Sequence, residues 1–256
     1  MNALRHTPRR AYWICFTPRT GSALLCQLLR ATGVAGRPEE YFWRDNEPLY
    51  RAQWHVTTYH DYLERALEEG TTPNGIFGAK VDVGVYLAHF FRQLRRLPQF
   101  EDATLSQCAI LSRLFPDLKC LWLTRRNKVR QAVSWWKAVQ SNVWVQSTTE
   151  APRPTPPLTY HFAAIDQLVN ESVMREAAWA EYFAAWQITP LTIVYEDFIA
   201  DYASTVAHIL RYLEVSDPYV LDATTVTLAR QVDSLSEEWV QQYREEKQHH
   251  WPNRAW

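Results

Sequence analysis

Four short apolar segments, separated from one another by helical patterns, are the feature that most constrains how this chain folds. The apolar segments are Ala11–Thr17, Ile76–Val81, Leu118–Thr124 and Leu191–Tyr195. Apolar residues recur at helical spacing in Ser22–Ala31, Gly84–Leu97, Leu105–Phe115, Lys128–Val139 and His161–Trp186. Short apolar runs that alternate with helices are typical of parallel strands covered on both faces. The sequence therefore predicts an α/β fold of three layers, a central parallel β-sheet flanked by helices.

The length of 256 residues suits one domain spanning 1–256, and the chain contains no internal repeat. Four prolines between positions 152 and 157 interrupt the helical patterns, so we expect a Pro-rich loop over 145–160. The polar residues 1–10, ahead of the first apolar run, are expected to be flexible.

The net charge, the apolar segments, the cysteines and the histidines indicate which partners and cofactors not to expect. The formal net charge of -1 gives no reason to expect a nucleic-acid partner. The sequence shows neither a signal peptide nor a segment long enough for a membrane span, so we expect a cytoplasmic protein. The four cysteines form no CxxC pair and are predicted to be reduced core thiols. The histidines lack carboxylates at ligand spacing, so no metal site is expected.

The junction between the first apolar run and the first helix, Thr17–Ser22, carries the first chemical signal. Gly21 and small hydroxyl residues at such a junction let backbone N–H groups converge on an anion, and the helix dipole adds partial positive charge. Arg19 offers a forked guanidinium, and Ser22 is placed to cap the helix. An ordinary strand–helix turn remains the alternative. The GxxxxGK[ST] string of nucleoside triphosphatases is absent from the sequence, which disfavours ATP or GTP hydrolysis.

The second signal lies at the end of the third apolar run. Arg126 follows that run, and Ser134 comes eight residues later on the next helix, so the guanidinium and the hydroxyl can close on one additional phosphate. Arg125, Lys128 and Arg130 add positive charge at a helix N-terminus, where the dipole disfavours cations. An anionic ligand would explain this placement, although a solvated basic helix start explains each of the three individually.

These two segments resemble the donor site of sulfotransferases that use 3′-phosphoadenosine-5′-phosphosulfate (PAPS). Thr17–Leu25 resembles their 5′-phosphosulfate loop, and Arg126 with Ser134 resembles their 3′-phosphate site. The resemblance is closest to the bacterial trehalose 2-sulfotransferase family. It extends in order through Leu28–Phe42, Thr72–Lys80, Arg130–Trp144 and Leu228–Arg244. It implies a single-domain P-loop-like fold, PAPS as donor with 3′-phosphoadenosine-5′-phosphate (PAP) as product, and a homodimer.

The resemblance also implies a role for individual donor-site residues. The 5′-phosphosulfate would be held by Arg19, Thr20, Gly21, Ser22 and the backbone of Ala23. Arg126 and Ser134 would bind the 3′-phosphate, and Tyr195 would lie beside the adenine, with a core tyrosine as its alternative. Ala23 departs from the Ser or Thr usual at its position, which removes one hydroxyl contact.

On the acceptor side, Glu40 aligns with the catalytic base of the family, and Arg19 would assist catalysis by stabilising charge on the transferred group. The acceptor-contacting loop would comprise Arg37, Pro38, Glu39, Glu40, Tyr41, Phe42 and Trp43. Glu39 is expected to be solvated or structural, because adjacent side chains rarely point the same way. Val81–Gly84 departs from the trehalose enzymes, so the expected acceptor is a small molecule or glycan rather than trehalose specifically.

Two other classes of function stay open at this stage. A nucleotide-dependent kinase on a similar sheet is the first, and the missing Gly-Lys-Ser/Thr string counts against it. A non-catalytic nucleotide-binding homologue is the second, for which Ala23 is the single indication. The preferred hypothesis is transfer of a sulfuryl group to a carbohydrate hydroxyl by in-line displacement, with Glu40 as general base.

Overall fold

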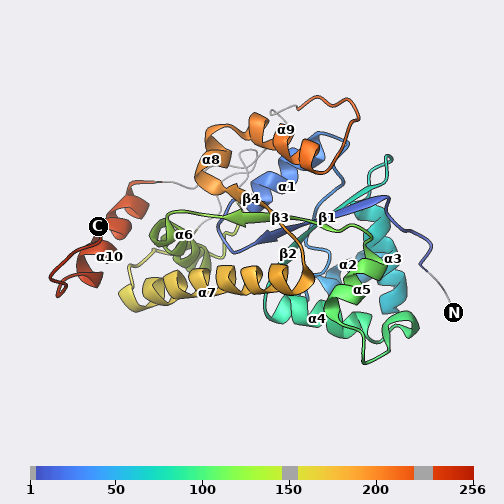
Figure 1. Cartoon of the computed structure of the whole chain (residues 1–256). Helices are drawn as coiled ribbons and strands as arrows, with labels where there is room; N and C mark the ends of the chain where they lie inside the picture. Colours follow the sequence, from blue (N-terminus) through green and yellow to red (C-terminus); the bar gives the residue numbers. More distant parts are fainter. Residues whose placement is uncertain (1–3, 146–154, 222–232) are drawn as a thin grey trace.

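A computed structural model describes residues 4–145, 155–221 and 233–256. Its centre is a sheet of four parallel strands in the order β2-β1-β3-β4 (Figure 1). The strands are β1 (Arg10–Phe16), β2 (Ile76–Asp82), β3 (Lys119–Thr124) and β4 (Leu191–Val194). The α/β fold class predicted from the alternation of apolar runs and helices is confirmed.

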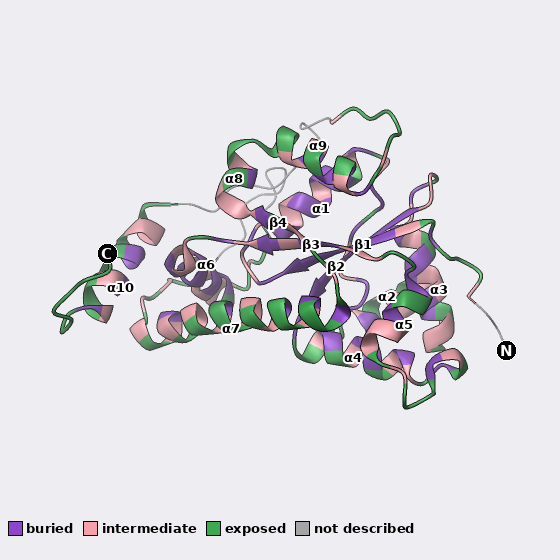
Figure 2. Cartoon of the chain, viewed as in Figure 1, coloured by how far each residue is buried: buried purple, intermediate pink, exposed green. Residues whose placement is uncertain are grey.

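Helices cover both faces of the sheet, because successive side chains of each strand point to opposite faces. Tyr12, Ile14 and Phe16 of β1 pack with α1 (Ser22–Ala31), α8 (Tyr195–Ala200) and α9 (Tyr202–Tyr212). Trp13 and Cys15 pack with the helices of the opposite layer, which are α3 (Tyr59–Gly70), α4 (Val85–Leu94), α5 (Gln107–Leu114) and α7 (Phe162–Trp186). Figure 2 shows the buried residues concentrated along the strands and the inner helix faces.

A third apolar cluster extends the core beyond the sheet. It joins α6 (Lys128–Ser141), the first turns of α7 and α10 (Ser234–Lys247) through Val133, Ile165 and Trp239. In Figure 1 these helices lie together at the end of the molecule marked by the C-terminus. The cluster therefore brings the C-terminal helix close to the helix that carries Ser134.

The structure adds elements that the sequence reading did not assign. Residues 47–70 form α2 (Glu47–Trp54) and α3, and a short 3₁₀ helix, η1 (Pro98–Phe100), follows α4. The fourth apolar run ends as a strand at Val194, so Tyr195 is the first residue of α8 rather than the last residue of β4. Aromatic contacts hold α2 and α3 to the preceding loop, with Tyr41 packed on Tyr50.

The structure describes part of the N-terminal residues and of the Pro-rich loop, and all four cysteines. The backbone N–H groups of Arg5 and His6 donate to Glu64, so part of 1–10 is held against α3, while residues 1–3 lie outside the described range. Residues 145 and 155–160 of the predicted Pro-rich loop carry no helix or strand, and 146–154 lie outside the described residues. All four cysteines are free, and three of them are buried, as predicted. Burial raises the pKa of Cys26 to about 12.

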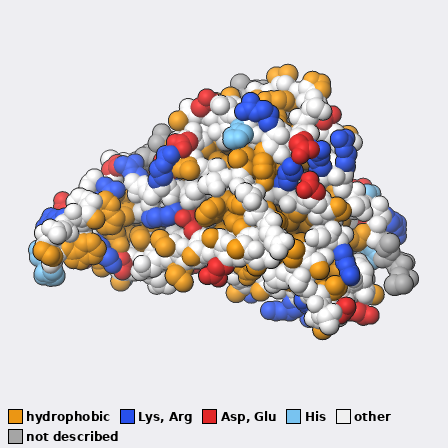
Figure 3. Space-filling model, viewed as in Figure 1, with side chains coloured by type: hydrophobic (Ala, Val, Ile, Leu, Met, Phe, Trp, Pro, Cys, Tyr) orange, Lys and Arg blue, Asp and Glu red, His pale blue; other side chains and the backbone are white. Residues whose placement is uncertain are grey.

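The surface and the helices agree with the composition. On the face drawn in Figure 3, basic and acidic side chains are interspersed and form no continuous basic stripe. Among the described residues, no helix is both long enough and apolar enough to cross a lipid bilayer.

Candidate active site

A cavity of about 830 Å³ lies at the carboxyl edge of the sheet. Its lining comes from residues that follow or end all four strands, including Arg19 after β1, Asp82 at the end of β2, Arg125 after β3 and Tyr195 after β4. Helices α6, α7 and α10 contribute further side chains. The carboxyl edge of an open parallel sheet is the usual position for ligands in such folds.

The β1–α1 turn forms one wall of the cavity through an unusual backbone. Arg19 and Gly21 both have positive φ, at 68° and 84°. Gly21 is the N-cap of α1, and a Cβ there would lie 2.8 Å from the ring of Tyr195. Ser22 is the first helical residue, so the prediction that its side chain caps the helix was wrong. The left-handed turn packs its backbone against Tyr195, and Gly21, Ser22 and Ala23 at the N-terminal end of α1 line the cavity.

Arg19 connects this turn to α6. Its Nε donates to Oγ of Ser134 at 2.9 Å, and its guanidinium also donates to the carbonyl oxygen of Trp144. Burial, with a smaller contribution from the positive charge of Arg125, lowers the pKa of Arg19 to about 10. Arg19 is therefore still charged at neutral pH, in an environment that favours an anion beside it.

The basic residues at the start of α6 separate into two groups. Arg125 and Arg130 line the cavity, with Arg125 donating to the carbonyl oxygen of Arg19 and stacking 4.5 Å from the ring centre of Tyr195. Arg126 is outside the lining of the cavity. Its guanidinium makes two hydrogen bonds to Asp197, at 2.8 and 2.5 Å. Of the two residues predicted for the 3′-phosphate, the structure places Ser134 in the cavity and directs Arg126 toward Asp197.

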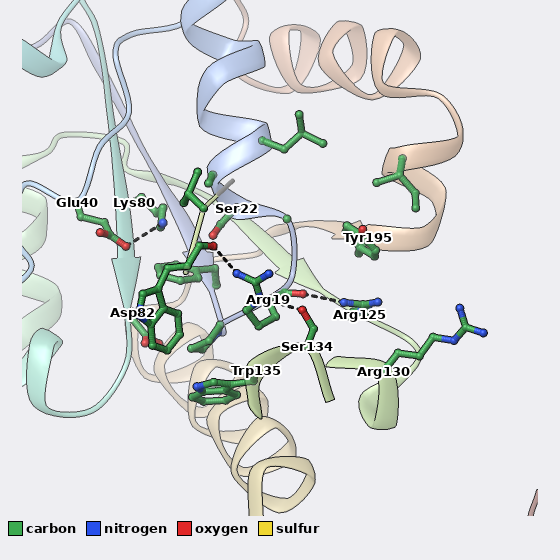
Figure 4. Close-up of a pocket in the computed structure, with 18 of the residues that line it drawn as sticks. Arg19, Ser22, Glu40, Lys80, Asp82, Arg125, Arg130, Ser134, Trp135 and Tyr195 are labelled. Carbon is green, nitrogen blue, oxygen red and sulfur yellow. Dashed lines mark hydrogen bonds and ion pairs between the residues drawn. The ribbon is translucent and has the colours of Figure 1, made fainter. Parts of the chain in front are cut away.

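Glu40 lies on the opposite side of the cavity (Figure 4). Its Oε1 is 2.8 Å from the ammonium of Lys80, and its Oε2 accepts from Asn46 at 3.4 Å. Glu39 pairs instead with Arg30 and does not line the cavity. The two carboxylates diverge because this segment runs alongside β2, where Lys80 N–H donates to the carbonyl of Glu39. The expected difference between the adjacent glutamates agrees with this geometry.

The remaining residues predicted for the acceptor loop divide between the cavity and the core. Trp43 lines the cavity and stacks on Tyr86, with ring centres 3.6 Å apart. Tyr41 and Phe42 are buried in the core, and Pro38 is also buried. Arg37 donates to the carbonyl oxygen of Glu69, away from the cavity. Trp43 and Glu40 are thus the two loop residues that the structure brings to the cavity.

The structure also places several residues in the cavity that the sequence reading did not select. Lys80 and Asp82 are alternate residues of β2, and Arg175 reaches the cavity from α7 with Trp135 beside it. Charged residues at the end of an otherwise apolar strand were the available signal for Lys80 and Asp82. Nothing in the local sequence indicated that Arg175, near the middle of a long helix, would reach the same place.

The charges of the cavity are distributed unevenly. Five basic side chains and three carboxylates line it, a formal excess of two positive charges: Arg19, Lys80, Arg125, Arg130 and Arg175 against Glu40, Asp82 and Glu237. Figure 4 shows Arg125 and Arg130 on one side of Arg19, and Glu40, Lys80 and Asp82 on the other. The half of the cavity that contains Arg125 and Arg130 suits an anionic ligand. The half that contains Glu40, Lys80 and Asp82 offers both hydrogen-bond donors and acceptors. Among the described residues, no group of three or more His, Cys, Asp or Glu side chains is placed to hold a metal ion.

Comparison with known proteins identifies the family of this chain. The model of the Stf0 sulphotransferase family matches residues 11–246. The chain belongs to that family. The trehalose 2-sulfotransferase of Mycolicibacterium smegmatis is 29% identical over 269 residues, covering 93% of this chain and 96% of the relative. That of Mycobacterium tuberculosis is 30% identical over 261 residues, covering 93% and 95%. The resemblance to the trehalose 2-sulfotransferases is confirmed.

Solved structures agree on the fold. The crystal structure of a sulfotransferase from Alicyclobacillus acidocaldarius has a TM-score of 0.50 and 15% identity to this chain, and it covers 94% of this chain and 95% of its own. At this identity the likeness concerns the fold, and it supports the P-loop-like arrangement of the sheet and its flanking helices.

Proposed function

We propose that this sulfotransferase moves the sulfuryl group of PAPS onto a hydroxyl of a carbohydrate or glycoconjugate. The observation that carries the proposal is the hydrogen bond between Arg19 and Ser134, because it joins two segments that resemble the two ends of one donor site. An adenosine with phosphates at its 3′ and 5′ positions needs two anion sites at one cavity. The surplus of basic residues on this side of the cavity supports an anionic donor.

The half of the cavity that contains Arg125 and Arg130 is the proposed donor half. There we assign the 5′-phosphosulfate to Arg19, the N–H groups of Thr20–Ala23 and the positive end of α1. Arg19 would stabilise negative charge that grows on the bridging oxygen during transfer. Ser134 would bind the 3′-phosphate, joined by Arg126 after its guanidinium turns away from Asp197. Tyr195 packs against the turn and would lie beside the adenine, where Arg125 already covers its ring.

The half that contains Glu40, Lys80 and Asp82 is the proposed acceptor half. There Glu40 would remove the proton from the acceptor hydroxyl as the new S–O bond forms. The S–O bond to the PAP leaving group breaks in the same displacement, and the proton ends on Glu40. Lys80, 2.8 Å from Glu40, keeps the carboxylate oriented and places a positive charge beside the reacting oxygens. A positioned general base typically contributes about 10²–10⁴-fold in rate.

Trehalose is the first acceptor to test, because both curated relatives carry it in their names. The aromatic pair of Trp43 and Tyr86 lines the cavity and offers an apolar ring face of the kind on which sugars stack. The segment Val81–Gly84, which departs from the trehalose enzymes, includes Asp82 of the cavity lining, so glucose and disaccharides other than trehalose belong in the panel.

Two measurements test the proposal. Calorimetry with PAP, adenosine 5′-phosphosulfate and ATP should show the tightest binding for PAP, because of its 3′-phosphate. Transfer of radiolabelled sulfate from PAPS to the sugar panel should then identify the acceptor. Preference for ATP would favour the kinase alternative instead. Tight PAP binding without transfer to any acceptor would favour a non-catalytic homologue.

A further inference from the structure

Asp82 ends β2 with a buried carboxylate at the edge of the cavity. The side chain is 0% exposed, yet the residue lines the cavity. Its Oδ1 accepts the backbone N–H of Val83 at 2.7 Å, and its Oδ2 accepts from the guanidinium of Arg175 at 2.7 Å. Both oxygens are therefore already engaged, so Asp82 acts on its surroundings through Arg175.

Arg175 is held in place from three directions. Asp82 binds its Nη1, Glu171 accepts from its Nε and Nη2 at 2.9 and 2.6 Å, and the ring of Trp135 lies 5.4 Å from the guanidinium carbon. A guanidinium has more N–H donors than the three used here. Arg175 also lines the cavity, so it has N–H donors left for a ligand bound there.

Keeping a carboxylate buried at this position has an energetic cost. Burial raises the pKa of Asp82 to about 6, although the charges of Arg175 and Lys80 and the hydrogen bond from Val83 oppose the rise. Replacement of a buried ion pair by apolar residues is often neutral or stabilising, so such pairs frequently serve function. Lys80, whose charge acts on Asp82, also pairs with Glu40, so one lysine links Asp82 to the proposed catalytic base.

We propose that Asp82 is a positioning residue of the acceptor half, which fixes the Arg175 guanidinium so that it binds acceptor hydroxyls and sets which of them reaches Glu40. The inference rests on the proposed sulfuryl transfer and adds a specificity determinant to it. Stacked Trp43 and Tyr86 line the same cavity, so a sugar ring on these aromatics would meet Arg175 through its hydroxyl groups.

The test uses Asp82→Asn, since asparagine imitates the protonated carboxyl. We expect a KM for trehalose or glucose about tenfold above that of the parent at pH 8, the loss of one hydrogen bond to a charged group. The ratio of the two kcat/KM values should approach one at pH 5, where the parent is protonated as well. The charges of Arg175 and Lys80 act on Asp82, and burial together with the charge of Asp82 raises the pKa of Tyr86. Glu171 and Glu40 pair with Arg175 and Lys80, and all five groups are common to both proteins.

Asp166→Asn is the matched control, because Asp166 is also an ion-paired carboxylate, with Lys247 as partner, and it lies on α7 outside the lining of the cavity. It should leave KM unchanged at every pH. The Kd for PAP should stay within about twofold of the parent in both variants. Arg175→Gln provides a second route, with a raised acceptor KM, if Asp82→Asn does not fold.

Three results would overturn the inference. The first is an acceptor KM at pH 8 that neither Asp82→Asn nor Arg175→Gln changes. The second is a parent-to-variant ratio that stays constant from pH 5 to pH 8, because a purely structural role would give that. The third is that the complex of the parent with PAP binds neither trehalose nor glucose when sugar binding is measured by tryptophan fluorescence. Failure of the proposed function shows in the parent itself, as absent PAP binding, as a preference for ATP, or as PAP binding without transfer to any acceptor in the panel.

Discussion

Arg19 donates from its Nε to the Oγ of Ser134 at 2.9 Å, and this hydrogen bond joins the β1–α1 turn to helix α6. The two residues are 115 positions apart in the sequence. Each lies in the lining of the cavity, so the bond joins the two segments to which we assign the ends of the donor. In the proposed complex, both groups would exchange this contact for contacts with the donor.

The first prediction concerns Ser134. Ser134→Ala should weaken PAP binding about tenfold, because the 3′-phosphate loses the hydrogen bond that the Ser134 hydroxyl would donate to it. Ser141→Ala is the control, since Ser141 lies on the same helix and bonds the carbonyl of Lys137 outside the cavity. Calorimetry measures both variants. Equal affinity in the two variants would remove Ser134 from the donor site.

The second prediction compares Arg126 with Arg130. Arg126→Ala should reduce the preference for PAP over adenosine 5′-phosphosulfate about tenfold or more, because the 3′-phosphate loses a charge-assisted contact. Asp197→Asn should have the opposite effect, since it frees the Arg126 guanidinium from its present partner. Arg130 lines the cavity and pairs with Glu237. If Arg130→Ala abolishes the preference and Arg126→Ala does not, the 3′-phosphate assignment moves to Arg130.

The local chemistry of the donor turn was predictable from sequence, whereas its partners across the cavity were not. Arg19 and Gly21 lie within one strand–helix junction, so their short-range pattern carries the information. Asp82 and Arg175 meet only because β2 pairs with β1 and α7 packs on the face of the sheet to which Trp13 points. That pairing depends on tertiary packing, which local propensity does not encode.

The helices between positions 47 and 70 illustrate a different limit. Leu63, Ala66 and Leu67 of α3 have helical spacing and are buried, so the signal was present. In α2 only Glu47 is buried, and tertiary contacts stabilise the helix, such as the 2.7 Å hydrogen bond between Glu47 and His89 of α4. Tyr195 was assigned to a strand because its apolar run continues unbroken, and the start of α8 ends that strand one residue earlier.

The third prediction concerns the general base. Glu40→Gln should reduce kcat by about 10²–10⁴-fold while leaving the Kd for PAP unchanged, because the amide keeps the shape and cannot accept the proton. Glu39→Gln is a matched control at the adjacent position, where the carboxylate pairs with Arg30 outside the cavity. Single-turnover transfer from radiolabelled PAPS measures both. Nearly full activity of Glu40→Gln on a good acceptor would show that another group takes the proton.

The fourth prediction separates backbone strain from packing in the donor turn. Gly21→Ala and Gly33→Ala each place a side chain at positive φ, which should cost about 1 kcal/mol of unfolding free energy. A Cβ at Gly21 would also meet the Tyr195 ring at 2.8 Å, whereas nothing lies within 4 Å of one at Gly33. Gly21→Ala should therefore be the more destabilised in urea and should lose PAP affinity. Equal losses for both variants would contradict the close packing of Tyr195.

The fifth prediction follows the stability of the fold through the titration of Asp82. Burial raises the pKa of Asp82 from its usual 3.8 to about 6, so the folded state binds this proton more tightly than the unfolded chain. The resulting stabilisation is complete below pH 3.8 and is lost as pH rises through 6. Asparagine does not titrate, so between pH 5 and pH 8 the parent should lose about 1 kcal/mol of unfolding free energy relative to Asp82→Asn. Urea unfolding at both pH values measures this difference. A difference that is the same at the two pH values would mean that Asp82 titrates in the folded protein as it does in the unfolded chain.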